Sequence, residues 1–188
     1  YKQEPKEFNL EIEKSIKVLE DIVQEKIIGF RAPHFSITEK SLWAVDILMA
    51  NGIKYDSSVF PTKNFLYGFP SAPLDIYYFK KLIEFPLSVI KLFNLNIPFA
   101  GGFYFRILPY KFVRWSIKRL NEIGRPVCMY FHPWEFDGKQ PRLRLPLVLK
   151  TIHYGNLKYT EVRFKKLLGD FKFSTIKEVL SNRLKEAL

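Results

Sequence analysis

The chain has 188 residues and a mass of 22.3 kDa, which suits one domain with a sizeable buried core. Its hydrophobic content of 47% and aromatic content of 16% exclude an intrinsically disordered protein. The net charge of +11 admits an anionic partner, but the basic residues are spread along the chain without a dense tract, so we expect a solvated basic surface and no nucleic-acid partner.

Two further classes of protein are disfavoured. No apolar run approaches the roughly 18 residues of a membrane span, so we expect no transmembrane segment. The single cysteine, Cys128, argues against a disulfide framework and is expected in the core.

Because the chain starts at Tyr1 and leads directly into a helical pattern, we interpret it as the C-terminal piece of a longer protein. Its compartment, cytoplasm or cell envelope, stays open.

The N-terminal third predicts alternating helices and strands. Apolar residues at helical spacing indicate an amphipathic helix over residues 5–24. Residues 26–31 have the pattern of a strand. Thr38 is a plausible N-cap for a helix over residues 39–50, and residues 53–56 form a second short strand. Both strands end at polar side chains.

The middle of the chain predicts a less regular region and then a helix. Residues 60–108 contain prolines, many aromatic residues and several extended pieces, which indicate hairpins and loops. Pro109 is expected to start a helix that Gly124 stops. The apolar residues 125–129 then predict a buried parallel strand.

Histidine, proline and two acids follow this strand. Side chains just beyond the carboxyl ends of parallel strands face the crevice where α/β proteins do chemistry. His132 therefore is a candidate for proton transfer, since an ordinary imidazole titrates near neutral pH. A structural histidine bonded to a backbone carbonyl is the alternative.

The C-terminal part predicts a loop over residues 138–146 and a helix from Thr160 to about residue 168. Residues 171–173 have the pattern of a short strand, and Thr175 with Glu178 forms a capping box for a last helix. The alternation of helices and strands indicates an α/β, barrel-like fold.

Three predicted strand ends carry reactive groups. Asp56 could fix the tautomer and orientation of the His132 imidazole. Arg31 could hold a carboxylate or stabilise developing negative charge. The sequence has neither a His-x-x-x-His pair nor a Gly-x-Ser-x-Gly turn, so it shows no evident metal cage or acyl-enzyme nucleophile.

Residues 31–36, 55–61 and 130–135 resemble the third, fourth and fifth motifs of NodB-type polysaccharide deacetylases. Together with further stretches, the resemblance extends over nearly the whole chain. The branch that accompanies bacterial exopolysaccharide and exosortase loci is also similar at residues 84–88, 100–106 and 153–157.

The resemblance implies a partial, distorted (β/α) barrel whose first strands are missing, in a single domain over residues 1–188 with a family-specific extension from about residue 135. It implies a hydrolase that removes N-acetyl groups from the amino sugars of a polysaccharide with a divalent metal, usually zinc. The family's first two motifs supply the base and the metal ligands. Both would precede Tyr1, so we expect this fragment to hold no metal and to be inactive alone.

By matched position, the resemblance implies a role for each candidate. His132 would be the general acid that protonates the leaving amine, and Asp56 would orient it. Arg31 would position the missing base. The backbone N–H of His34 would help to hold the tetrahedral oxyanion, although relatives often carry Tyr or Ser at this position.

Two aromatic side chains, Phe35 and Trp134, could line the sugar groove, and packing in the core is an equal alternative for each. His153 lies far from the three motifs, and we interpret it as structural. Two other functions stay open at this point: a non-catalytic carbohydrate-binding relative with altered metal positions, and a basic nucleic-acid-binding domain, which would bind oligonucleotides with steep salt dependence.

Overall fold

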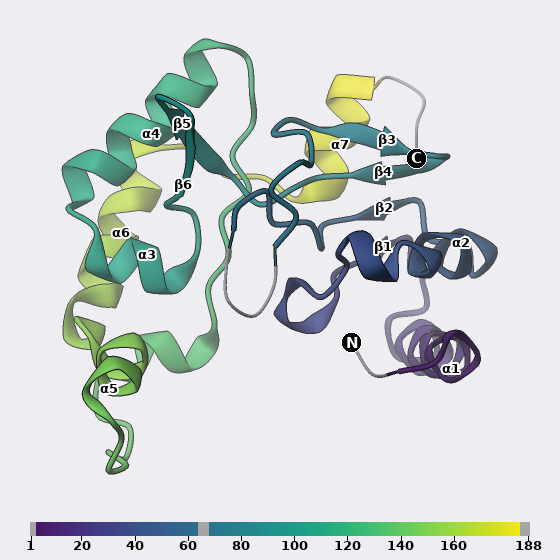
Figure 1. Ribbon diagram of the computed structural model, residues 1–188, viewed down its shortest axis with the longest axis horizontal. Coiled ribbons are helices and arrows are strands. Elements are labelled where there is room, and N and C mark those ends of the chain that lie inside the picture. Colours follow the sequence, from purple (N-terminus) through teal and green to yellow (C-terminus); the bar gives the residue numbers. More distant parts are fainter. Residues whose placement is uncertain (1–2, 64–67, 185–188) are drawn as a thin grey trace. The chain divides into compact units, whose positions relative to one another are not determined.

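The computed structural model describes residues 3–63 and 68–184, which form two compact units (Figure 1). The first unit contains the chain up to Leu87 together with the segment from Thr175 onward, and the second contains Ser88–Ser174. The architecture is mixed α/β, as expected. The described residues form no closed barrel, and the single-domain organisation stays a prediction.

The first unit is built on a four-stranded mixed sheet with the order β1-β2-β4-β3. The first three of these strands are parallel, and β3 is antiparallel to β4. The strands are short: β1 (Gly29–Phe30), β2 (Tyr55–Asp56), β3 (Tyr77–Phe79) and β4 (Leu82–Glu84). Gly29 in β1 leaves room for the ring of Tyr55 on β2, which would lie 2.2 Å from a Cβ at this position.

Helices cover this sheet in the first unit: α1 (Pro5–Val23), α2 (Trp43–Ala50) and α7 (Ile176–Leu184), with the 3₁₀ turns η1 (Pro33–Phe35) and η2 (Glu39–Ser41). Phe8 of α1 packs edge-on against Trp43, with ring centroids 5.5 Å apart, and joins a buried cluster that includes Ile12 and Leu48. The helices expected at residues 5–24 and 39–50 are confirmed, the latter with a 3₁₀ first turn.

The second unit combines a hairpin with a helical layer (Figure 1). The hairpin is β5 (Val89–Leu92) and β6 (Leu95–Pro98), and the helices are α3 (Gly102–Ile107), α4 (Tyr110–Glu122), α5 (Leu147–Tyr154) and α6 (Thr160–Asp170), with the turns η3 (Pro133–Phe136) and η4 (Leu157–Tyr159). Phe99, Phe105 and Leu167 are fully buried at its centre.

Two strand predictions in the second unit are wrong. Residues 125–129 form no strand, and the segment makes only an isolated parallel bridge between Tyr130 and Gly101. Pro126 has no N–H to donate, and the N–H of Cys128 donates to the Ser88 hydroxyl at 2.8 Å instead of to a ladder. Residues 171–173 form no strand either. Cys128 is buried, as expected.

Nowhere in residues 3–63 and 68–184 is a helix both long enough and apolar enough to cross a membrane.

Candidate functional site

The parallel strands of the first unit bring three charged residues to one edge of the sheet. Arg31 follows β1, and Asp56 and Glu84 end β2 and β4. Asp56 is in register with Phe30 on one side and with Glu84 on the other. The predicted grouping of Arg31 with Asp56 at strand ends is therefore present, and Glu84 is an additional member that sequence reasoning missed.

The guanidinium of Arg31 is fixed by the residue after Asp56. Its Nε donates to the backbone carbonyl of Ser57 at 2.9 Å, and its Nη2 donates to the Ser57 hydroxyl at 2.7 Å. That hydroxyl donates in turn to the carbonyl of Phe85 at 2.7 Å. Ser57 is buried, so the cation is held in one orientation by a rigid part of the sheet edge.

The loop after β1 turns through two consecutive residues in the left-handed region, His34 with φ 56° and Phe35 with φ 51°. Non-glycine residues seldom adopt this conformation, and such strain concentrates at functional sites. The N–H of Phe35 donates to the carbonyl of Ala32, whereas the N–H of His34 has no acceptor within the described part of the chain. The ring of Phe35 is buried against Phe60.

Asp56 lies in a buried polar cluster and is only 1% exposed. One oxygen accepts a hydrogen bond from the Ser58 hydroxyl at 2.5 Å. Glu84, the register partner of Asp56 on β4, accepts from the N–H of Val59 at 2.9 Å. Burial raises the pKa of Asp56, and its hydrogen bonds oppose that rise.

Tyr77 of β3 faces the same acids. It is the register partner of Glu84, and its buried hydroxyl has no hydrogen-bond partner among the described residues. Burial raises the pKa of Tyr77, and the neighbouring charges of Glu84 and Asp56 raise it further. The sequence signal for Glu84 was its place in residues 84–88, which match the family resemblance.

The raised pKa of Asp56 gives a pH-dependent prediction for stability. The folded chain binds the proton of the Asp56 carboxyl group more tightly than the unfolded chain does. Stability is therefore lost as the pH rises from the ordinary pKa of 3.8 through the pKa of Asp56 in the folded chain. Asn at this position cannot ionise, yet it can accept from Ser58 and donate to Glu84. We expect Asp56→Asn to raise the free energy of unfolding at pH 8 by on the order of 1 kcal/mol.

Urea unfolding at pH 4, 6 and 8 measures this effect. The stability of Asp56→Asn relative to the natural chain should increase with pH and be smallest at pH 4. A difference that stays constant over the three pH values would show that Asp56 does not titrate in this way.

His132 lies in the second unit, at the start of η3. Its backbone N–H donates to Oε2 of Glu135 at 2.8 Å, and Oε1 of Glu135 accepts from Nε of Arg106 at 3.1 Å. The other guanidinium nitrogens of Arg106 donate to carbonyls at the end of α5, those of Ile152 at 2.9 Å and Gly155 at 2.6 Å. One buried ion pair therefore fixes both the backbone of His132 and the end of α5.

Burial lowers the pKa of the Arg106 guanidinium, and the charge of Glu135 opposes that shift. Gly102 at the start of α3 makes room for the pair, because a Cβ at this position would lie 1.8 Å from Oε2 of Glu135. Sequence reasoning missed this pair. Its only signal was that residues 100–106 and 130–135 both matched the family resemblance.

Three rings form a row beside this ion pair. The imidazole of His132 stacks on Trp134 with centroids 6.0 Å apart and planes inclined by 12°, and the ring of His153 lies 5.8 Å from that of Trp134 with planes inclined by 45°. The guanidinium of Arg106 lies 5.4 Å from the Trp134 ring. Trp134 is 36% exposed, and both imidazoles are exposed. His153 is thus next to the candidate site, although its carbonyl also has a structural role as an acceptor for Arg106.

The structure leaves two expectations as predictions. Asp56 belongs to the first unit and His132 to the second, so their pairing is not tested. No group of three or more His, Cys, Asp or Glu side chains within residues 3–63 and 68–184 is arranged to hold a metal ion. These residues alone therefore do not fit the metal centre that the family resemblance implies.

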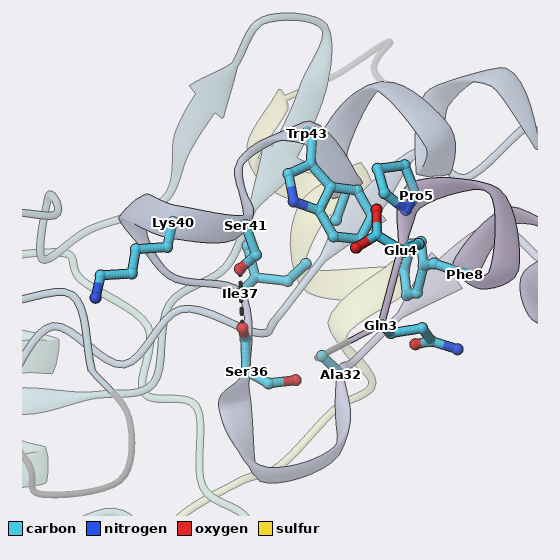
Figure 2. A pocket seen from close by; sticks show the side chains of 11 residues that line it. Gln3, Glu4, Pro5, Phe8, Ala32, Ser36, Ile37, Lys40, Ser41 and Trp43 are labelled. Atoms are coloured by element: carbon cyan, nitrogen blue, oxygen red, sulfur yellow. Dashed lines mark hydrogen bonds between the residues drawn. The ribbon is translucent and has the colours of Figure 1, made fainter. Parts of the chain in front are cut away.

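A pocket of about 340 Å³ opens behind the loop that follows β1 (Figure 2). Phe8 and Trp43 form its apolar wall, and Glu4, Ser36 and Lys40 supply polar groups. The residues that line it do not include Arg31, Asp56 or Glu84. We therefore place the candidate site of the first unit at the strand ends and not in this pocket.

A family described as a domain of unknown function, DUF3473, matches residues 57–181. The matched range begins one residue after Asp56 and includes Glu84, Arg106 and His132. This family is associated with polysaccharide deacetylase-like proteins. No curated protein and no solved structure matches the chain.

Proposed function

Because the chain belongs to the DUF3473 family, we propose that it is part of a NodB-type polysaccharide deacetylase, which hydrolyses N-acetyl groups on the amino sugars of a polysaccharide. In this proposal the chain supplies the general acid of the reaction and the residues that support it. His132 protonates the leaving amine, Asp56 orients His132, and Arg31 positions the carboxylate base. Trp134 contacts the sugar, whereas the buried ring of Phe35 packs in the core.

The observation that carries the proposal is the backbone N–H of His34. The left-handed turn after β1 leaves this N–H without an acceptor among the described residues. His34 is also only three residues beyond Arg31, whose guanidinium is held by Ser57. Hydrolysis of an amide passes through a tetrahedral intermediate whose oxygen becomes negative. A backbone donor that needs no reorganisation is the group that stabilises such an oxyanion.

The row of three rings in the second unit, formed by His132, Trp134 and His153, supports the same reaction. A general acid must be reachable by the leaving amine, and the imidazole of His132 is exposed while its backbone is fixed through Glu135. Trp134 presents a partly exposed aromatic face beside it, of the kind that packs against sugar rings. Of the two predicted sugar contacts, Trp134 is the better placed, because Phe35 is buried.

The proposed reaction also requires a divalent metal. When bound, such a metal polarises the acetyl carbonyl and activates water. Residues 3–63 and 68–184 contain no ligand set for it, so its ligands and the base would have to come from outside these described residues.

The complete gene product tests the proposal. With zinc supplied, it is expected to release acetate from oligomers of N-acetylglucosamine, and the codons before residue 1 should encode Asp-Asp followed by His-x-x-x-His. If these motifs are scrambled and the product still binds the oligomers, it is a non-catalytic carbohydrate-binding relative. If it neither releases acetate nor binds them, but binds oligonucleotides with steep salt dependence, the proposal is wrong.

A further inference from the structure

Helix α5 is held in place without fully burying any of its apolar side chains. None of its residues is buried, and Leu147, Val148, Leu149 and Ile152 are all exposed. A helix of a globular protein normally packs through its apolar face. Here the backbone is held instead, because Arg106 binds the carbonyls of Ile152, His153 and Gly155 at the helix end.

The loop before α5 is folded onto the helix in the same manner. The N–H of Leu143 donates to the hydroxyl of Tyr154 at 3.1 Å, and the guanidinium of Arg142 lies 4.4 Å from the Tyr154 ring centroid. Leu143 is itself 68% exposed. Residues 138–154, which we call the basic-apolar segment, thus form a folded element whose aliphatic side chains contribute little to the core of the second unit.

The charges of the basic-apolar segment have one sign. It contains four basic residues and not a single Asp or Glu, and all four are exposed: Lys139, Arg142, Arg144 and Lys150. In Figure 1, α5 and this loop lie at the margin of the second unit. The segment therefore presents aliphatic side chains interspersed with cations, at a position where another surface can reach them.

From this combination we infer that the basic-apolar segment docks on the surface of an anionic lipid bilayer, with its aliphatic side chains in the interface and its cations on the headgroups. A soluble polyanion would use the cations but would not need the leucines. A protein partner would use the aliphatic side chains but would not require four cations without an acid. An anionic bilayer uses both, as amphipathic interfacial helices do.

The inference goes beyond the proposed function and does not depend on it. The segment lies on the surface and does not span the bilayer.

Co-sedimentation of the full chain with vesicles tests the inference. Vesicles of equal parts phosphatidylglycerol and phosphatidylcholine should bind it, and pure phosphatidylcholine vesicles should bind it weakly. Raising NaCl from about 50 to 300 mM should weaken binding, because the charges are screened. Replacing Lys139, Arg144 and Lys150 by Gln should lower affinity by about 100-fold, at about fivefold per cation.

A matched pair of variants separates lipid docking from non-specific adhesion. Val148→Gln/Ile152→Gln removes two exposed aliphatic side chains of α5, which are 70% and 39% exposed, and should lower affinity by about tenfold or more. Val162→Gln/Leu168→Gln changes two comparable residues on α6, 69% and 48% exposed, and should bind as the natural chain does. Circular dichroism and the urea midpoint check that both variants fold.

Each other outcome overturns the inference. Equal binding of the α5 variant and the natural chain would leave the aliphatic side chains without a role. Equal binding to uncharged vesicles, or no binding to anionic ones, would remove the lipid surface as the partner. If the α5 variant instead abolishes a dimer seen in solution, the face is an interface between copies of this chain.

Discussion

Replacing Glu135 by Ala is expected to lower the free energy of unfolding by about 3–5 kcal/mol, the range for a buried ion pair that loses one partner. The side chains of Arg106 and Glu135 are 1% and 2% exposed, so water cannot take over the role of the carboxylate. The guanidinium would stay charged in a buried place, and the N–H of His132 would lose its acceptor as well. Urea unfolding at pH 7 measures the loss.

The same unit offers a matched control for this change. Glu122 pairs with Arg119 on α4 at 3.6 Å, but the two side chains are 63% and 58% exposed, so Glu122→Ala should change stability by only about 0.5 kcal/mol. Gly102→Ala should also destabilise the unit, since its Cβ displaces the Glu135 carboxylate. If Glu135→Ala costs no more than Glu122→Ala, the buried pair does not hold the unit together.

Helices with local signals could be predicted from the sequence, and helices without them could not. The apolar spacing of α1 and the capping box at Thr175 act within one or two turns, and both predictions are confirmed. Helix α3 opens with a glycine, and α5 buries none of its residues and is held by Arg106 from 46 positions away. A local pattern contains no information about such a distant contact.

The sheet shows a similar limit. Short apolar runs correctly located β1 and β2, because both runs end at polar residues that mark a sheet edge. The run at residues 125–129 had the same appearance but forms no ladder, since the N–H of Arg125 donates to the carbonyl of Leu120 and the N–H of Cys128 donates to the Ser88 hydroxyl. An apolar run indicates burial, whereas strand pairing depends on which backbone lies alongside.

Half of the candidate site was visible in the sequence for the same reason. Arg31 and Asp56 stand where strands end, which is a local signal. The residues that surround them are not local: Ser57, which holds the guanidinium of Arg31, lies 26 positions beyond it, and Glu84 lies beside Asp56 on the next strand. That Ser57 and Glu84 are buried at this place follows only from the folded chain.

In the complete gene product, His132→Ala is expected to lower turnover of an N-acetylated oligosaccharide by about 10²–10⁴-fold, the usual contribution of a general acid. This expectation depends on the proposed deacetylase reaction, in which the leaving amine takes its proton from His132. Asp56→Asn should lower turnover in the same direction, because the carboxylate would favour the protonated imidazole. Since Asp56→Asn is expected to stabilise the fold at pH 8, its loss of activity could not be attributed to unfolding.

The other two histidines provide the controls. His34 is expected to act through its backbone N–H, so His34→Asn, which retains this N–H and tolerates the left-handed turn, should keep turnover within about tenfold. His153→Ala should also keep most of the turnover, because the contact of His153 with Arg106 is made by its carbonyl. Acetate release measured at saturating oligosaccharide distinguishes the three variants. Near-normal turnover of His132→Ala, or an equal loss in His34→Asn, would contradict the assignment of His132 as the acid.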